Sequence, residues 1–231
     1  MKFSVDPKIF QLFPELRLGV VIAEEIHNAG TDDQVQELLR KAESDINKKL
    51  EIEFLSKNEF IKNWKTAYKL LKIMDGRPSH EALIRRSLKG NEIPHINKLV
   101  DIYNYLSLEF MTPFGGEDLS KIKGNLQLRF AQGTEDFVEL GSNDVTHPNP
   151  DEVIYSDEEK VLCRKFNWRE SELTKLPDST RNAFFVSETL PPFPEKVLDN
   201  LLEKFADALS RFCGAKATTY KIDSKNTEIQ W

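Results

Sequence analysis

Apolar residues recur at three- and four-residue steps through the first half of the chain, which is the spacing of amphipathic helices. The steps that join Phe60, Trp64 and Tyr68 show it most clearly. Thr31 and Ser56 each begin a Ser/Thr-x-x-Glu/Gln capping pattern, so both are predicted to cap the helices that follow them. The predicted helices cover residues 32 to the low fifties, 57–73, 79–88 and 96–110.

Beyond residue 112 the apolar residues form the alternating or continuous runs that are typical of β-strands. Strands are predicted over residues 126–131, 137–140, 153–156, 160–166, 183–188 and 216–222, with an earlier strand over 15–23 and a last helix ending near 212. Because helices come first and strands afterwards, without regular β-α-β alternation, the order predicts an α+β fold. We expect a curved, mainly antiparallel sheet flanked by helices, with an N-terminal α/β extension.

The chain has 231 residues, which is enough for one large domain with a substantial core. No internal repeat or low-complexity tract divides it. We therefore expect one compact unit, made of an N-terminal extension (1–76), a core (77–190) and a C-terminal helix and strand (191–231).

The charge balance limits the kinds of partner. Lys and Arg number 32 against 38 Asp and Glu, a formal charge of −6, which argues against a general positive field that coats nucleic acid but leaves room for a local basic face. No DNA partner is expected. No run approaches the roughly 18 apolar residues of a membrane helix, and the N-terminus resembles no secretory or transit peptide. We expect a soluble, cytoplasmic protein with no membrane partner.

The motifs of common enzyme classes are absent: no glycine-rich nucleotide loop, no His-Glu-x-x-His and no Gly-x-Ser-x-Gly. The four histidines occur singly, and the two cysteines have no partner at metal-binding spacing. We expect neither a metal nor a cofactor. Cys163, inside a predicted strand with no base nearby in the sequence, is predicted to be a reduced structural residue.

Polar residues on one predicted helix form the first candidate site. Asn97, Asp101 and Asn104 lie close to one helical stripe and would form a polar ledge. Capping of the helix and tethering of the preceding loop explain the same residues equally well.

Two further segments have a composition suited to ligand contact. Gly115 and Gly116 predict a turn where backbone can approach a ligand, although a plain turn explains them too. In residues 164–171 three cations alternate with two aromatic rings, which suits phosphate contact and base stacking, or equally a solvated rim over buried rings. These cations and rings are Arg164, Lys165, Arg169, Phe166 and Trp168.

Several motifs in order resemble the B3/B4 domain of the phenylalanyl-tRNA synthetase β subunit. Residues 93–105 (Ile-Pro-His-Ile-Asn-Lys-Leu-Val-Asp-Ile-Tyr-Asn-Tyr) and 112–119 (Thr-Pro-Phe-Gly-Gly-Glu-Asp-Leu) resemble its Arg-Pro-x-Asn-x-x-Val-Asp-x-x-Asn-Tyr and Gln-Pro-x-His-Ala-x-Asp signatures. Residues 128–133 resemble its Val-Arg-x-Ala-x-x-Gly strand, and residues 169–174 resemble its Ser-Glu-Val-Thr turn. The resemblance covers about 77–190 and no aminoacylation motif, so the chain looks like a freestanding B3/B4 protein.

The resemblance implies an editing role, because this domain of the synthetase hydrolyses tyrosine wrongly esterified to the phenylalanine tRNA. Gly115 aligns with the editing histidine, and Val186 with the glutamate that recognises the tyrosine hydroxyl. Glu188 follows two residues later on the same strand face. Residues 163–168 replace a glycine-rich pocket wall, which is expected to make the pocket narrower and more cationic. A different amino acid or ligand is therefore implied.

We expect the segments around Gly115, Trp168 and Glu188 to wall a concave sheet that accepts the charged end of aminoacyl-tRNA. The expected catalytic groups are Glu188, which would position water or hold the amine, Asn104, which would orient groups, and backbone amides at Gly115 and Gly116. The expected substrate-binding residues are Asn97, Asp101, Phe166, Trp168, Arg164, Lys165 and Arg169. Arg85, Arg86 and Lys89 are further cations for the tRNA end, although a solvated helix face explains Arg85 and Arg86 better.

Three functions remain open from the sequence. The first is binding of aminoacyl-tRNA with hydrolysis of a mischarged ester in trans. The second is a noncatalytic module for tRNA, another RNA or a small ligand such as a free amino acid, which the loss of the histidine and the glycine wall favours. The third is a partner-binding protein that uses its acidic N-terminal helices.

Overall fold

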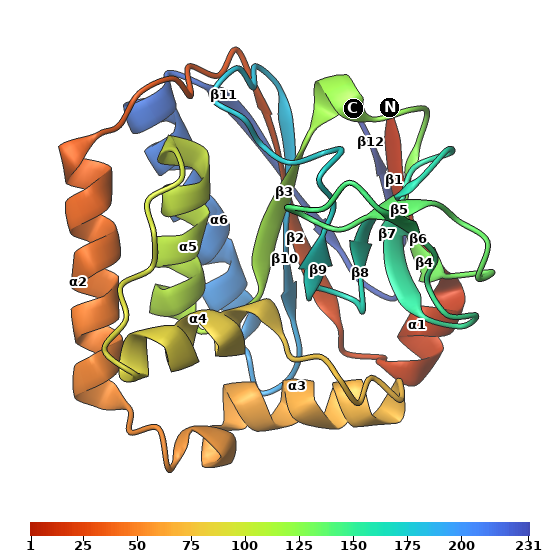
Figure 1. Cartoon of the computed structure of the whole chain (residues 1–231), viewed down its shortest axis with the longest axis horizontal. Helices are drawn as coiled ribbons and strands as arrows, with labels where there is room; N and C mark the ends of the chain where they lie inside the picture. Colours follow the sequence, from red (N-terminus) through yellow and green to blue (C-terminus); the bar gives the residue numbers. More distant parts are fainter.

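The computed structural model describes residues 1–231 and arranges them in three layers (Figure 1). A four-stranded antiparallel sheet lies in the middle, with helices on one side and a second sheet on the other. Its strands follow the spatial order β11 (Lys216–Ile222), β2 (Arg17–Glu24), β10 (Ala183–Thr189) and β3 (Phe114–Asp118). The predicted final strand therefore joins this sheet as β11, beside β2.

The second sheet has six strands and is antiparallel except for the parallel pair β1–β4. Its order is β12 (Glu228–Gln230), β1 (Lys2–Val5), β4 (Leu126–Phe130), β7 (Val153–Ser156), β8 (Val161–Arg164) and β9 (Arg169–Glu170). A separate small ribbon pairs β5 (Phe137–Val138) with β6 (Val145–Thr146). The mainly antiparallel α+β fold predicted from the sequence is confirmed.

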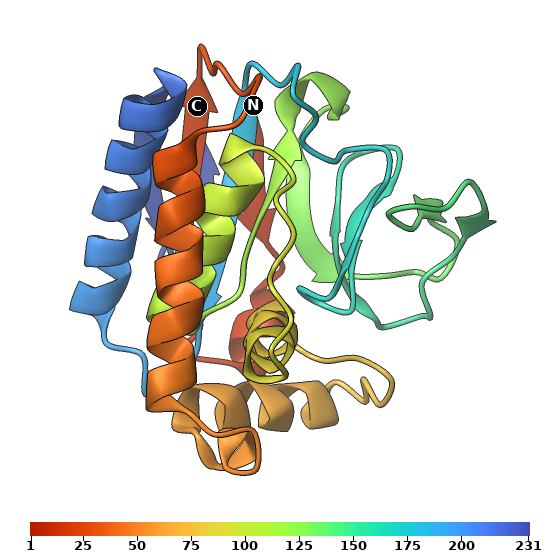
Figure 2. The same cartoon turned by 60° about the vertical axis from the view of Figure 1, so that its left-hand side comes forward.

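α5 and α6 pack on the outer face of the four-stranded sheet, and α2 packs against α5 (Figure 2). The helices are α1 (Pro7–Leu12), α2 (Asp33–Lys49), α3 (Glu59–Leu70), α4 (Ser79–Leu88), α5 (Lys98–Phe110) and α6 (Glu195–Cys213), with short 3-10 turns at Leu55–Lys57 and Leu119–Lys121. None of these helices combines the length and the apolar character that crossing a membrane requires.

The four-stranded sheet is buried on both faces, which explains the continuous apolar run of β2. Alternate residues such as Val21 pack toward the helices, and the residues between them, such as Val20, pack toward the six-stranded sheet. On the helical side the Phe205 ring lies 4.6 Å from that of Phe114 and 4.8 Å from that of Phe185, measured between centroids. These contacts join α6 to β3 and β10.

The helix caps differ from those predicted. Asp32, not Thr31, caps α2, and Asn58, not Ser56, caps α3; each side chain accepts hydrogen bonds from backbone N–H groups of the first turn. Ser56 lies in the preceding 3-10 turn. Asp and Asn are as common at helix N-caps as Ser and Thr. The capping pattern alone therefore does not decide which of several nearby polar residues is the N-cap.

The paired glycines are also placed differently, because they lie within β3 and not in a turn. An added Cβ at Gly116 would lie 2.4 Å from Cδ1 of Phe185, its partner on β10, so glycine leaves room for that ring beside β3. The predicted turn was therefore wrong, and close packing explains the glycine.

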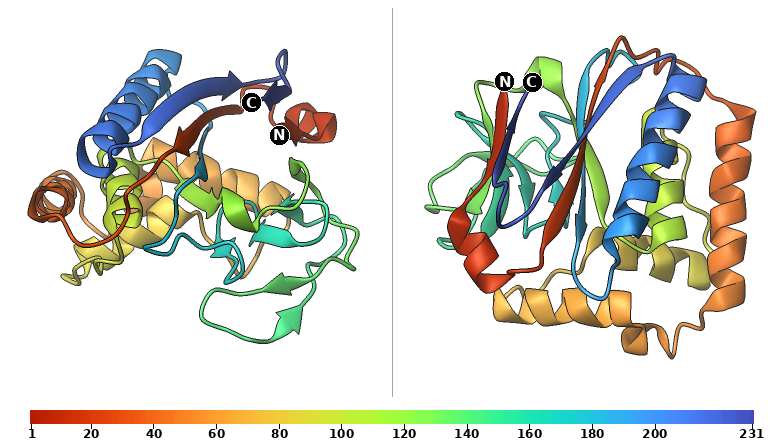
Figure 3. Two further views of the ribbon diagram at one scale, coloured as in Figure 1. Left: turned by 90° about the horizontal axis from the view of Figure 1, so that it is seen from above. Right: turned by 180° about the vertical axis from the view of Figure 1, so that it is seen from behind.

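The two ends of the chain lie next to each other in the six-stranded sheet (Figure 3). The terminal amine of Met1 donates to the carbonyl of Trp231 at 2.6 Å. The N-terminal segment also supplies β2, which lies between β11 and β10. Residues 1–76 are thus built into both sheets.

Candidate functional site

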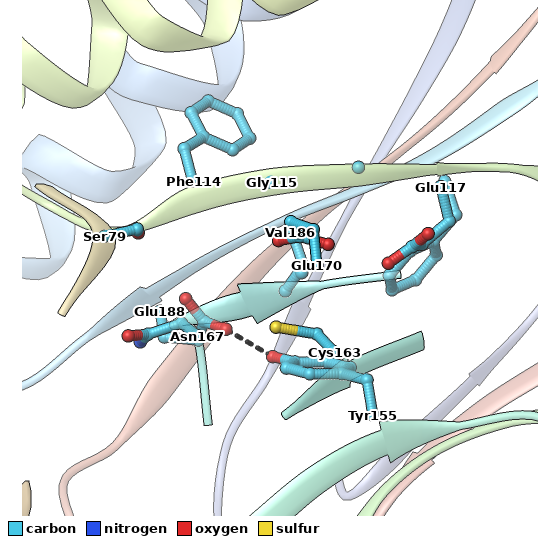
Figure 4. Close-up of a pocket in the computed structure, with 12 residues that line it drawn as sticks. Ser79, Phe114, Gly115, Glu117, Tyr155, Cys163, Asn167, Glu170, Val186 and Glu188 are labelled. Atoms are coloured by element: carbon cyan, nitrogen blue, oxygen red, sulfur yellow. Dashed lines mark hydrogen bonds between the residues drawn. The ribbon is translucent and has the colours of Figure 1, made fainter. Parts of the chain in front are cut away.

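A small cavity lies where the open edge of the four-stranded sheet faces the six-stranded sheet (Figure 4). β3 and β10 form one wall, β7, β8 and β9 the other, and the start of α4 closes one end. Its volume is about 20 Å³, which is room for about one water molecule. The lining residues are Ser79, Phe114, Gly115, Gly116, Glu117, Tyr155, Cys163, Asn167, Glu170, Phe184, Val186 and Glu188.

Three carboxyl groups line this cavity, from three different strands. Glu117 lies on β3, Glu170 on β9 and Glu188 on β10; Glu117 and Glu188 are buried, and Glu170 is half-buried. No Lys, Arg or His is among the lining residues. The cavity is therefore acidic and contains no cation of the chain to balance these carboxyls.

Glu188 is held in place by a short hydrogen bond. The hydroxyl of Tyr155 donates to Oε1 of Glu188 at 2.5 Å (Figure 4). Burial raises the pKa of Glu188 to about 7, although the Tyr155 hydrogen bond opposes the shift. At neutral pH this carboxyl is thus close to half ionised, which suits a group that takes up and releases protons.

Burial raises the proton affinity of both Glu117 and Glu170, although the hydrogen bonds of Glu170 with Glu117 and Cys163 oppose the rise at Glu170. Burial, and then the negative charge of Glu170, raise the pKa of Glu117 well above its usual range. Burial likewise raises the pKa of Glu170 to about 7. An added Cβ at Gly115 would lie 3.1 Å from Oε1 of Glu170, so glycine at this position leaves room for that carboxyl. Glu170 thus lies beside Gly115, one of the positions expected at the site.

Asn167 and Cys163 complete the polar wall. The amide oxygen of Asn167 accepts a hydrogen bond from the Tyr68 hydroxyl at 2.8 Å, while its buried Nδ2 has no partner in the protein. Cys163 is a free, buried cysteine, and burial followed by the charges of Glu170 and Glu117 raises the pKa of its thiol. The thiol stays protonated, so Cys163 is not an activated nucleophile.

The structure brings together some of the residues expected at the site. Gly115, Gly116 and Glu188 line one cavity, and Val186 lies beside them. Trp168 does not line it, although its neighbour Asn167 does. Glu117, Glu170 and Tyr155 were not anticipated, because their strands meet only in the folded chain.

The expected polar ledge on α5 lies elsewhere. Oδ1 of Asn97 accepts from the backbone N–H of Val100 at 3.1 Å, which caps α5, and its Nδ2 donates to the carbonyl of Leu176 at 2.8 Å. Asp101 accepts from the backbone N–H of Ile96. Asn104 is buried on α5 and lines no cavity described here. The geometry of Asn97 and Asp101 is that of capping and loop tethering.

The expected cations of the pocket wall point to carboxylates outside the cavity. Arg164 donates to both carboxylate oxygens of Glu152, at 2.9 and 3.0 Å. Lys165 pairs with Asp75 at 2.6 Å, and Arg169 pairs with Glu139 at 2.9 Å. The prediction of a more cationic pocket was wrong, because these cations are neutralised by residues that the local sequence does not contain.

The two aromatic residues of this segment pack into the protein. The Phe166 ring is fully buried and lies 5.2 Å from the ring of Trp64. Trp168 is half-buried, with the Arg169 guanidinium 4.8 Å from its ring centroid. Neither ring lines the cavity, so neither is placed to stack on a group bound there.

A larger, basic cleft lies next to the cavity, between α3, α4 and the segment that joins them. Its volume is about 570 Å³. Five cations line it against one carboxylate, Glu81, and they are Lys65, Lys69, Arg77, Arg85 and Lys89. Arg86, also expected at this surface, donates to the carbonyl of Glu92 and does not line the cleft.

The cleft and the cavity share one short segment. Gly76, Arg77 and Pro78 line the cleft, and the next residue, Ser79, lines the cavity. Glu81 is paired with Lys65 at 3.3 Å and with Arg85 at 2.7 Å. The other three cations of the cleft form no ion pair in the structure, so they are free to contact an anion.

The comparisons with known proteins agree with this architecture. A model of the B3/4 domain family matches residues 64–213, and the chain therefore belongs to that family. It is 31% identical over 80 residues to the phenylalanine–tRNA ligase beta subunit of Shewanella oneidensis, covering 35% of this chain and 10% of that protein. It is 30% identical over 111 residues to the same subunit of Nitrosococcus oceani, covering 47% of this chain and 14% of that protein.

A solved structure shares the fold. An N-terminal fragment of the phenylalanyl-tRNA synthetase beta subunit from Pyrococcus horikoshii superposes with a TM-score of 0.51 and 14% sequence identity, covering 95% of this chain and 53% of the fragment. The chain thus spans only 10–14% of the length of the two curated relatives described above.

Proposed function

We propose that this protein binds the aminoacylated 3′ end of a tRNA and hydrolyses the ester that joins the amino acid to the ribose. The observation that carries the proposal is that consecutive residues of one segment line both spaces, 76–78 the basic cleft and 79 the acidic cavity. One ligand that presents phosphates to the cleft and one small polar group of its aminoacyl part to the cavity would occupy both. A cytoplasmic location, expected from the sequence, is part of the same proposal.

The basic cleft is suited to the phosphates of the tRNA end. Its five Lys and Arg side chains and one Glu give a local charge of 5 − 1 = +4 in a chain whose formal charge is −6. Lys69, Arg77 and Lys89 need not break an ion pair to meet a phosphate. Phosphate contacts of this kind position a nucleic acid without reading its sequence.

The cavity is suited to hydrolysis of an activated ester by water. Glu188, with a pKa of about 7, would accept a proton from the attacking water and deliver it to the departing ribose oxygen. β3 is the edge strand of its sheet, so its outer side carries backbone N–H groups unpaired within the sheet, near Gly115 and Gly116, to stabilise the oxyanion. No covalent intermediate is required.

The size of the cavity supports a second candidate, a module that binds without hydrolysis. A space of about 20 Å³ admits no aromatic side chain, so an editing reaction on an esterified tyrosine would require the walls to move. If the walls stay as they are, the chain would bind tRNA through the cleft without turnover.

A deacylation experiment separates these functions. tRNAs charged with each amino acid are incubated with excess protein, and release of the amino acid is followed. Glu188→Gln should slow release by roughly 10²–10⁴-fold, which is the usual contribution of a general base. Lys69→Ala/Arg77→Ala should weaken binding of the tRNA, whereas Lys48→Ala/Lys196→Ala removes the same charge from α2 and α6 and should not.

The two parts of the proposal fail separately in this experiment. No release from any charged tRNA would refute hydrolysis and leave the binding module. A tRNA affinity that responds equally to both double substitutions would refute the cleft as the binding surface.

A further inference from the structure

The cavity contains a pair of carboxyls that no cation of the protein balances. Glu117 is 6% exposed, and its Oε2 has no hydrogen-bond partner. Glu170 faces the same space, and neither Lys nor Arg lines it (Figure 4). Buried carboxyls normally have a hydrogen-bond donor or a cation as partner, so without a ligand this pair depends on a proton shared between the two groups.

A second unpartnered polar group lies in the same wall. Nδ2 of Asn167 is buried and makes no hydrogen bond with the protein, although Asn167 lines the cavity. Glu188, by contrast, already accepts a hydrogen bond from Tyr155. The unpartnered atoms of the cavity lining are therefore Oε2 of Glu117, an acceptor that a cation can satisfy, and Nδ2 of Asn167, a donor that it cannot.

The volume of the cavity restricts what could satisfy this pair. The space of about 20 Å³ suits one group about as large as a water molecule. A primary ammonium group has this size, carries the complementary charge and donates three hydrogen bonds. A guanidinium or an aromatic ring is larger than the space.

We propose that the cavity recognises a primary ammonium group of its ligand and holds it between Glu117 and Glu170, while Glu188 stays bound to Tyr155. The identity of that ligand as an aminoacyl group rests on the proposed function. The ammonium has two sources in an aminoacyl ester, the α-amine of any amino acid and the side-chain amine of lysine or a similar residue.

Amide-linked 3′-aminoacylamino-adenosines, which resist hydrolysis, test the proposal by isothermal titration calorimetry. If the α-amine is the recognised group, the alanyl compound should bind at least about 10-fold more tightly than the N-acetylalanyl compound. Acetylation of the α-amine removes its charge and its charged hydrogen bonds. If the side-chain amine is the recognised group, the lysyl compound should bind at least about 10-fold more tightly than the norleucyl compound, which lacks that amine. Equal affinities within both pairs, or no binding of the alanyl and lysyl compounds, would overturn the proposal.

Substitutions locate the effect. Glu117→Gln and Glu170→Gln should each remove most of the preference for the free amine, whereas Glu203→Gln, an exposed change on α6, should keep it. If Glu117→Gln does not fold, as judged by its thermal unfolding, the Glu170→Gln variant carries the test. A preference that survives in the folded variants contradicts the assignment.

Failure of the proposed ammonium recognition and failure of the proposed hydrolysis give different results. A protein that discriminates amines but releases no amino acid from any charged tRNA would keep this inference and lose the hydrolase. A protein that deacylates tRNA without discriminating free from acetylated amines would keep the hydrolase and lose this inference.

Discussion

The burial of Glu188 predicts a particular dependence of stability on pH. Its pKa is raised from 4.5 to about 7 in the folded chain, chiefly by desolvation. Because the folded state binds the proton more tightly than the unfolded state, the stabilising contribution is complete below about pH 4.5 and is lost as the pH rises through about 7. A shift of this size corresponds to about 3 kcal/mol at alkaline pH.

Glu188→Gln removes this titration and keeps a side-chain oxygen that can accept the hydrogen bond from Tyr155. Any cost of the new amide group is independent of pH, so the change with pH reports the loss of the Glu188 carboxyl together with its effect on the titration of Glu170. Relative to the wild type, the variant should gain about 2–3 kcal/mol of unfolding free energy between about pH 5 and about pH 8.5.

Urea unfolding at these two pH values, followed by circular dichroism, measures the difference. The comparison between wild type and variant cancels the titration of groups far from the cavity. Glu170, Cys163 and Asn167 lie in the same cavity and stay unchanged. A difference between the two proteins that is the same at both pH values would refute the reasoning that desolvation controls Glu188.

The remaining predictions concern the cleft and the packing of the sheets. Lys69→Ala/Arg77→Ala should lower the slope of log affinity for tRNA against log salt by roughly 1.4, about 0.7 for each lost phosphate contact, in fluorescence anisotropy titrations; an unchanged slope argues against phosphate contacts. Gly116→Ala should destabilise the fold by about 1–3 kcal/mol in urea, because its Cβ meets the Phe185 ring; wild-type stability would show that the strands adjust freely. Phe205→Ala should cost about 3–5 kcal/mol in the same assay, and a loss below about 1 kcal/mol would contradict tight packing against β3 and β10.

The elements with long, periodic patterns were predictable from the sequence. α6 and β10 are a 19-residue helix with one apolar face and a seven-residue strand with an apolar and aromatic run, and both lie close to their predicted ranges. In both elements the residues that form the apolar pattern in the sequence are also the residues that are buried in the fold. The order of these elements was sufficient to predict the fold class.

The chain ends were not predicted, because their pairing is long-range. β1 and β12 are four and three residues long, and neither has a distinctive pattern on its own. They form strands because residues 2–4 meet residues 228–230 across the whole length of the chain. Short strands of this kind acquire their stability from their neighbours in the sheet.

The candidate site was predicted only in part for the same reason. Glu188 and Gly115 could be identified because they lie on or near motifs of the family. Glu117 and Glu170 could not, although they lie within the motifs at 112–119 and 169–174, because their carboxyls become unusual only when β3 and β9 face each other. The prediction that the basic segment 164–169 lines the pocket was wrong, because its cations pair with carboxylates that are distant in sequence. These carboxylates are Glu152, Asp75 and Glu139.

The central claim is that one ligand occupies the basic cleft and the acidic cavity together. Fluorescence anisotropy can compare a tRNA carrying an amide-linked alanine or lysine at its 3′ end with the same tRNA uncharged. The account predicts that at least one of the two charged forms binds about 10-fold or more tightly than the uncharged form, and that Glu170→Gln removes the difference. Equal affinities of charged and uncharged tRNA for the wild-type protein would contradict it.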